Sequence, residues 1–210
     1  MAVLDKRSRN DPRRDQTERA FLTATLELLD EGASFADLSV SRIAERAGRT
    51  RSAFYAHFED RRVLLRRLID EIGGDVLGVL DPFLHGDGPV DRAVLDASTR
   101  ATLARYRERT TLIRAVTEAA GYDQEIAAYW AGVADTAIEA ARRKLELEGL
   151  APADAEATAT ALVWMCERTC HQQVVRDTGI DDDVVCTAMV NIWWNSILAA
   201  RAAAGGAQPA

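Results

Sequence analysis

The stretch S-V-S-R-I-A-E-R-A-G-R-T-R-S-A-F-Y-A-H-F-E-D-R, residues 39–61, decides the fold of this chain. Two short helical patterns meet in it at Gly48. Ser39 is suited to cap the first helix, because its hydroxyl can accept a free backbone N–H of the first turn. Thr50 can cap a second helix that carries Phe54 inward. Two such helices joined at a glycine that tolerates φ > 0 are typical of a helix-turn-helix, whose second helix lies in a DNA major groove.

The outward face of the second helix carries hydrogen-bond donors. Arginine can bind guanine through two hydrogen bonds, and hydroxyl groups can bind phosphates or base edges. Arg61 follows an expected N-cap at Asp60, where a cation could anchor a phosphate. The candidate DNA-binding residues are Ser39, Ser41, Thr50, Arg51, Ser52, Ala53, Tyr55, His57 and Arg61.

A longer motif runs from Ile43 to Leu65 and reads I-A-x-x-A-G-x-T-x-x-x-F-Y-x-H-F-x-D-R-x-x-L-L. It resembles the DNA-binding domain of the TetR family of transcriptional regulators. The resemblance covers the first third of the chain and is far more specific than a bare helix-turn-helix. It implies a three-helix DNA-reading unit within residues 15–75.

The bulk composition agrees with a globular protein. The chain has 210 residues, of which 48% are hydrophobic and 28% charged, and these are ordinary values. No run approaches the roughly 18 apolar residues of a membrane span, and the first residues lack the apolar segment of a signal peptide. We therefore expect a cytoplasmic protein without a membrane partner. Three cysteines, an odd count, argue against a disulfide framework.

The net charge of −7 is unevenly distributed. Residues 1–67 hold 14 Lys and Arg against 11 Asp and Glu, a net charge of +3. Residues 68–210 hold 12 against 22, a net charge of −10. The positive charge thus coincides with the expected DNA-binding unit, although so small an excess carries no argument alone. Salt screens charges that lie more than about 8 Å apart at physiological ionic strength. The acidic charge of residues 68–210 therefore does not prevent residues 1–67 from binding phosphate.

The chain before and after the helix-turn-helix reads as further helices. Residues 1–14 form a basic arm, which either follows DNA phosphates or is a solvated tail. A helix is expected over 15–31 and a longer one over 60–80. The pair Gly73-Gly74 is either a soft point in the longer helix or a break between two helices. A Pro- and Gly-containing loop over 82–89 suggests the domain boundary.

The second domain, expected over residues 76–204, also reads as all-helical, which gives about nine helices in the chain and a flexible tail at 205–210. Helices are expected over 90–107, 110–120, 123–148, 152–177 and 181–203. The last two are apolar nearly all round, so they need cover on more than one side. In the TetR family the last two helices form the dimer interface, and this composition predicts a homodimer through them.

A second resemblance lies in these helices. W-M-C-E-R-T at Trp164–Thr169 and V-N-I-W-W-N-S-I at Val190–Ile197 are similar to the C-terminal half of the ethionamide-regulator-type TetR repressors. That group has an aromatic-lined tunnel for small hydrophobic effectors. By this resemblance the pocket-lining residues are Leu95, Thr102, Tyr106, Trp130, Val163, Cys166 and Trp193. Glu167, Thr169 or Tyr106 is then the polar anchor for the ligand, unless Glu167 only forms a structural ion pair with Arg168.

Simpler interpretations of these residues remain open. A tryptophan or tyrosine on an apolar helix face often belongs to the core. Cys166 and Cys170 lie one turn apart and with His171 could form a metal or redox site, but buried cysteines usually act as small hydrophobic residues. We expect no metal, no cofactor and no catalytic residue, because no nucleophile motif or phosphate loop is present.

The sequence therefore predicts an all-α, homodimeric regulator that binds double-stranded operator DNA. The resemblance implies a repressor that a small hydrophobic effector releases. Two alternatives stay open: an enzyme that uses the same pocket, and a helical small-molecule-binding or interaction protein that does not act on DNA.

Overall fold

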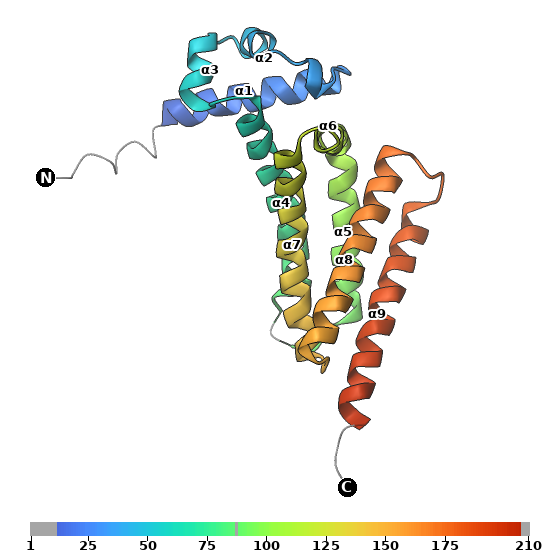
Figure 1. The fold of residues 1–210 in the computed structure, drawn as a ribbon. Coiled ribbons are helices and arrows are strands. Elements are labelled where there is room, and N and C mark those ends of the chain that lie inside the picture. The colour runs from blue at the N-terminus through green and yellow to red at the C-terminus, as the bar shows by residue number, and fades with distance from the viewer. Residues whose placement is uncertain (1–11, 87, 207–210) are drawn as a thin grey trace, which may run out of the picture.

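The computed structural model describes residues 12–86 and 88–206, and every regular element in these ranges is helical (Figure 1). This confirms the all-α fold. The elements are α1 (Pro12–Asp30), the 3-10 helix η1 (Phe35–Asp37), α2 (Val40–Arg46), α3 (Arg51–His57), α4 (Arg61–Leu84), α5 (Arg92–Glu108), α6 (Thr110–Ala120), α7 (Gln124–Leu147), α8 (Pro152–Val175) and α9 (Asp182–Gly206). Figure 1 shows α1, α2 and α3 at one end of the molecule, and α4 leading from them into a bundle of long helices.

Local capping sets the ends of the N-terminal helices. The Ser39 hydroxyl accepts the backbone N–H of Arg42 at 3.2 Å, and Asp60 caps α4 in the same way through Val63. Gly48 has φ of +61°, in the left-handed region that favours glycine, and so it turns the chain between α2 and α3. These interactions span three residues or fewer, and therefore a sequence pattern predicts them well.

Aromatic packing closes the N-terminal unit. The Phe21 ring of α1 meets the Phe54 ring of α3 edge to face, with ring centroids 5.3 Å apart. Phe58 joins them, with its centroid 6.2 Å from that of Phe21. All three side chains are at most 1% exposed. Edge-to-face rings add to the stabilisation from burial alone, so α3 is held rigidly on α1.

Helix α4 is continuous from Arg61 to Leu84. Of the two alternatives for Gly73-Gly74, the break between two helices is therefore wrong, and so is the expected start of the loop at Pro82, because the helix includes both positions. Gly73 is buried against α7, where an added Cβ would lie 3.3 Å from Val133. Pro82 removes one backbone donor near the helix end, but Phe83 and Leu84 are buried beyond it and hold the last turn in place.

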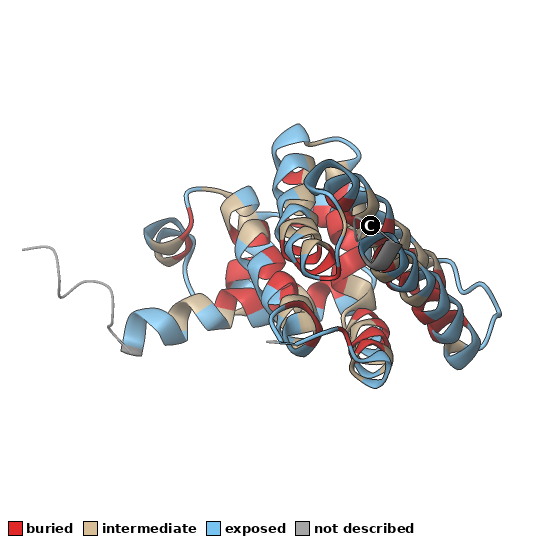
Figure 2. Cartoon of the chain, turned by 90° about the horizontal axis from the view of Figure 1, so that it is seen from below, coloured by how far each residue is buried: buried red, intermediate tan, exposed pale blue. Residues whose placement is uncertain are grey.

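Buried apolar side chains form two clusters. The larger runs without interruption from the N-terminal unit into the bundle, and the second fills the far half of the bundle. In the second cluster the Phe83 and Trp193 rings meet edge to face at 5.3 Å. Figure 2 shows that the buried faces of the bundle helices turn toward one another while their outer faces are exposed.

Polar contacts orient the N-terminal unit on the bundle. The Ser34 hydroxyl, just before η1, donates to the Glu118 carboxylate of α6 at 2.6 Å. Arg62 and Arg66 of α4 pair with Glu125 at the start of α7, at 3.3 and 2.9 Å. Exposed ion pairs contribute little stability individually. The continuous apolar core therefore holds the two parts together, and these pairs select their orientation.

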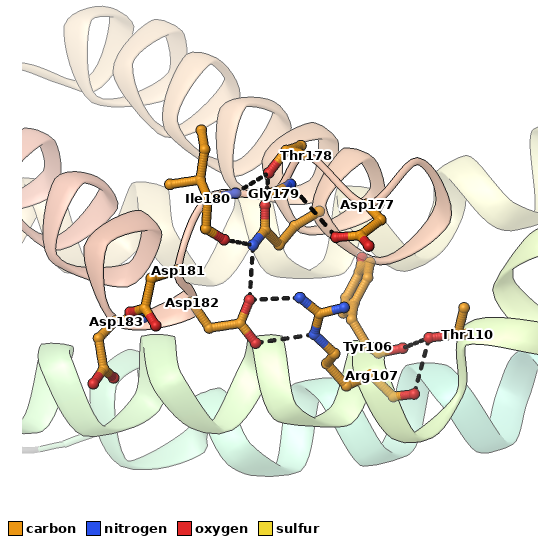
Figure 3. A network of polar contacts seen from close by, with 11 residues as sticks. Tyr106, Arg107, Thr110, Asp177, Thr178, Gly179, Ile180, Asp181, Asp182 and Asp183 are labelled. Atoms are coloured by element: carbon orange, nitrogen blue, oxygen red, sulfur yellow. Dashed lines mark hydrogen bonds and ion pairs between the residues drawn. The ribbon is translucent and has the colours of Figure 1, made fainter.

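A polar network closes the turn between α8 and α9 (Figure 3). Asp182 accepts two hydrogen bonds from the Arg107 guanidinium of α5, at 2.7 and 2.9 Å. Gln173 donates to the same carboxylate at 2.8 Å and to the Ile180 carbonyl at 2.5 Å. The bonds from Arg107 and Gln173 hold the pKa of Asp182 below its ordinary value. The network fixes the start of α9 against α5.

Two expected boundaries near the ends of the chain are wrong. The basic arm was expected to extend to residue 14, but Pro12 begins α1, and proline suits the first helical turn. Residues 1–11 lie outside the described part of the chain, as do residues 207–210 of the expected tail, whereas residues 205 and 206 belong to α9. Among the described helices, none combines the length and hydrophobicity that crossing a membrane requires.

Candidate nucleic-acid interface and ligand pocket

The helix-turn-helix presents α3 on the surface of the molecule. The Thr50 hydroxyl accepts the backbone N–H of Ala53 at 3.1 Å and lies 3.0 Å from the Ser52 hydroxyl. Arg51, Ser52 and Tyr55 are exposed, and Tyr55 is 52% exposed although its ring packs on that of Phe54 at 5.6 Å. A large aromatic side chain that stays exposed on a rigid helix is positioned to contact a partner.

The remaining DNA-binding candidates differ in how much they expose. Ser39 and Ser41 are exposed at the start of α2, whereas Ala53 is half-buried. His57 is turned partly inward: its ring lies 6.3 Å from that of Phe21, and its Nδ1 is buried without a hydrogen-bond partner in the described structure. Only part of the His57 ring is therefore available to DNA.

Arg61 has a role that the sequence did not reveal. Its Nη1 donates to the carbonyls of Phe35 and Ala36 at 3.1 Å each, and to that of Leu38. The guanidinium also lies over the Phe35 ring, 5.7 Å from the centroid. Arg61 thus ties the 3-10 helix before α2 to the start of α4. A phosphate contact by Arg61 stays a prediction, and it would have to use the donors that these carbonyls leave free.

The second candidate site is a cavity in the bundle. All eight expected effector-binding residues line it: Leu95, Thr102, Tyr106, Trp130, Val163, Cys166, Glu167 and Trp193. The space open to the centre of a water-sized sphere is about 100 Å³, within an empty volume of about 920 Å³ that includes the adjoining solvent. The cavity is therefore narrow, and a drug-sized ligand would have to widen it.

Helix α4 supplies a wall of the cavity that the sequence analysis missed. The α4 residues in this wall are Ile72, Val76, Leu77, Leu80 and Leu84, and α7 adds Val133, Ala134, Ala137 and Ala141. An apolar stripe at helical spacing predicts burial but does not distinguish a core contact from a cavity lining. No signal in the sequence could have assigned these residues to the pocket.

The cavity contains few polar groups, and most of them form hydrogen bonds to other groups of the protein. The hydroxyls of Thr99 and Thr102 donate to the carbonyls of Leu95 and Ser98, each at 2.8 Å. The Tyr106 hydroxyl has no hydrogen-bond partner in the described structure, and burial raises its pKa well above the ordinary value. It can therefore donate a hydrogen bond to a ligand at any physiological pH.

The two cysteines of the cavity are poorly accessible thiols: Cys170 is buried and Cys166 is partly buried. Burial raises the pKa of Cys166 to about 11, although its sulfur accepts a hydrogen bond from Trp193 Nε1 at 3.1 Å. The pKa of Cys170 is also raised by burial. Both thiols stay protonated near neutral pH, which disfavours thiolate chemistry and metal binding. The described residues include no cluster of His, Cys, Asp and Glu that could hold a metal ion.

Two family models match the chain. The model described as "Bacterial regulatory proteins, tetR family" matches residues 21–68, and that described as "Transcriptional regulator EthR, C-terminal domain" matches residues 95–199. The first range contains the helix-turn-helix, and the second contains all eight expected pocket residues. The matches thus fall on both candidate sites.

Curated relatives and solved structures agree with these models. The HTH-type transcriptional regulator EthR of Mycolicibacterium smegmatis is 29% identical over 202 residues, 89% of this chain and 88% of the relative. EthR of Mycobacterium tuberculosis is 28% identical over 193 residues, 89% of each chain. A putative TetR-family regulator from Syntrophomonas wolfei has a similar fold, with a TM-score of 0.71, 15% identity, and coverage of 88% of this chain and 96% of its own. A TetR-family regulator from Streptomyces coelicolor gives a TM-score of 0.70, 17% identity, and coverage of 90% and 83%.

Proposed function

The chain belongs to the TetR family of bacterial transcriptional regulators, with a C-terminal domain of the EthR type, and we propose that it is a repressor released from its operator by a small hydrophobic effector. DNA-binding regulation of transcription is the function of the family. The proposal adds the direction of control, the surfaces that bind, and the coupling between them. It also puts the protein in the cytoplasm, where bacterial operator DNA lies.

Operator recognition is assigned to the exposed face of α3. Arg51 is suited to bind a guanine edge, while Ser52 and Tyr55 can bind phosphates or bases. Ser39, Ser41 and Thr50 lie at helix N-termini, where hydroxyls and free N–H groups favour phosphate oxygens. Together these side chains surround the end of α3 that would enter the groove.

A homodimer through α8 and α9 supplies the second recognition helix. Large apolar side chains stay exposed on these helices in the single chain: Trp164, Val184, Ile192 and Leu198. An exposed apolar face of this kind marks an interaction surface. A two-fold dimer would place two copies of α3 about 34–36 Å apart, one turn of DNA, to match a palindromic operator.

The observation that carries the coupling is that α4 is one unbroken helix. Its first turn holds η1 through Arg61, and its later turns line the cavity. We infer that a ligand that widens the cavity displaces the α4 wall, and that the continuous helix carries this displacement to η1 and the helix-turn-helix. The effector therefore favours a state whose two α3 helices no longer match the operator. A typical coupling of about 1–3 kcal/mol would lower operator affinity roughly 5- to 150-fold.

A DNA titration tests the first part of the proposal. We expect tight binding to the DNA upstream of the protein's own gene, with affinity that falls steeply as salt rises. Arg51→Ala and Tyr55→Ala should each abolish this binding while the dimer persists in analytical ultracentrifugation. Arg143→Ala, an exposed change on α7, serves as the control. Full binding by both α3 variants would show that the recognition surface is assigned to the wrong helix.

Regulation rather than catalysis is the role we give to the pocket, since the relatives are named transcriptional regulators. The alternative is a helical binding protein that does not act on DNA. It predicts equal competition by random and upstream DNA at every salt concentration. Sequence-specific retention of the upstream fragment contradicts that alternative.

A further inference from the structure

Glu167 stands apart from every other residue around the cavity. Among the described residues that line it, Glu167 is the one whose side chain is acidic or basic. It projects from α8 beside Cys166 and is partly buried. The rest of the lining is aromatic, aliphatic or weakly polar. An ionisable group in such surroundings requires an explanation, because burying a charge without a partner is costly.

The Glu167 carboxylate has no partner in the described structure. No hydrogen bond or ion pair reaches its oxygens, whereas most other carboxylates of the bundle are paired with arginine. The neighbouring cation, Arg168, acts on it only at longer range, and its Nη1 lies 3.4 Å from His171 Nδ1. Tyr106 and Cys170 are the other titratable groups near enough for the Glu167 charge to raise their pKa values, and both are neutral when Glu167 is ionised. The carboxylate is therefore open to a ligand.

Aromatic rings complete this environment. Tyr106, Trp130, Trp164 and Trp193 line the same cavity. The faces of such rings carry negative potential and attract cations, most strongly where water is excluded. A carboxylate and several aromatic rings around one narrow apolar space together favour a positively charged ligand with a hydrocarbon body.

We propose that the effector is a lipophilic amine in its protonated form, whose ammonium group pairs with Glu167 and whose hydrocarbon part lies along the α4 wall. This inference deepens the proposed function and rests on it for the word effector, but binding itself can be tested without DNA. A neutral hydrophobic molecule of the same shape would bury the carboxylate further without pairing it. The ligand class is thus selected by the Glu167 carboxylate, which no described residue pairs.

The competing possibility at the same site is a neutral ligand that accepts a hydrogen bond from protonated Glu167. Burial raises the pKa of Glu167 above its ordinary value, and Arg168 partly opposes this. The two possibilities then differ in their pH dependence. Amine binding should strengthen as pH rises through the carboxyl pKa, because an alkyl ammonium stays charged until about pH 10. Binding of a neutral acceptor should weaken over the same range.

The test compares 4-phenylbutylamine with 4-phenylbutan-1-ol, which have nearly the same size and shape. Calorimetry and tryptophan fluorescence report their binding to the full-length dimer. We expect the amine to bind about tenfold or more tightly than the alcohol at pH 7.5. Glu167→Gln should remove this preference and keep alcohol binding, which shows that the cavity is intact. Glu156→Gln, an exposed change on the same helix, should keep the preference.

Several outcomes would overturn the proposal. They are equal binding of amine and alcohol, a preference that survives Glu167→Gln, and amine affinity that falls as pH rises from 5 to 8. Absence of amine binding at millimolar concentration would also overturn it. A separate titration with operator DNA distinguishes the two levels. If the amine binds through Glu167 but leaves operator affinity unchanged, the ligand class stands and ligand-controlled release fails.

Discussion

Replacement of Arg61 by alanine separates a structural cation from a DNA-binding one. The Arg61 Nη1 carries two N–H groups, which the carbonyls of Phe35, Ala36 and Leu38 share. Hydrogen bonds from a charged donor contribute about 1.5–3 kcal/mol each. Water can replace the bond to the exposed Ala36, while the cation over the Phe35 ring adds about 0.5–1 kcal/mol. The bonds to the part-buried carbonyls of Phe35 and Leu38, at the lower end of that range, and the ring contact together amount to about 3.5–4 kcal/mol. We expect Arg61→Ala to lower the free energy of unfolding by about this amount.

Two assays measure the two roles independently. Urea unfolding followed by circular dichroism gives the stability change, with Arg42→Ala as a matched control. Arg42 is exposed on α2, and its side chain donates no hydrogen bond to a described residue, so truncating that side chain should change stability by less than about 0.5 kcal/mol. Operator affinity measured across salt gives the phosphate contribution, because each lost phosphate contact lowers the logarithmic slope by about one.

The structural role predicts a large stability loss in Arg61→Ala with an unchanged salt slope. A phosphate contact predicts the reverse: wild-type stability and a slope reduced by about one. That second result would refute the assignment of Arg61 to the η1 carbonyls. Loss of both quantities would mean that the donors of Arg61 are divided between the carbonyls and the DNA.

Three further predictions concern the rest of the chain. Gly74→Ala should raise the free energy of unfolding by about 0.5–1 kcal/mol, because nothing lies within 4 Å of the added Cβ. Gly73→Ala should lack this gain, because its Cβ would lie 3.3 Å from Val133 of α7. Urea unfolding ranks the two variants, and a more stable Gly73→Ala would contradict the packing of α4 on α7. Burial alone would raise the pKa of Glu148, but bonds from Arg201 and a backbone N–H outweigh it and lower the pKa. Glu148→Gln should therefore lower the free energy of unfolding by about 1–3 kcal/mol at pH 7. This difference should shrink as pH falls below about 4.5, because protonation of Glu148 then removes the same stabilisation from the wild type. A difference in stability that does not depend on pH would refute the role of the charge. With a pKa of about 11, about one part in a thousand of the Cys166 thiol should be thiolate at pH 8. A disulfide reagent should therefore modify Cys166 far more slowly in the native protein than in urea. A fast reaction of the native protein would contradict the raised pKa.

Local interactions explain why so much of the DNA-binding unit could be predicted. The caps at Ser39, Thr50 and Asp60 each join groups three residues apart or fewer. The turn at Gly48 needs only its own backbone freedom. Helix periodicity then predicts which faces are buried, because 3.6 residues per turn align them. The family matches confirm the resemblance of this unit to the TetR family and the EthR-type resemblance of the C-terminal helices.

Longer-range packing explains where prediction failed. Pro82 lies inside α4 because Phe83 and Leu84 are buried after it, and no local rule anticipates that burial. The orientation of the Arg61 side chain depends on hydrogen bonds to carbonyls 23 to 26 residues earlier in the chain. Helix propensity and capping act over about one turn of helix. The residues next to Pro82 and Arg61 in the sequence therefore do not predict the burial after Pro82 or the contacts of Arg61.

The sequence by itself determined the all-helical fold, the caps at Ser39, Thr50 and Asp60, the family, and eight of the residues that line the cavity. Only the tertiary structure decided that α4 forms the facing wall of the cavity and that the Glu167 carboxylate has no partner there. A side chain's periodicity states that it is buried but not which side chains it meets, because the partners come from helices far apart in the chain. Whether a buried charge is paired or open to a ligand is settled only when those helices pack.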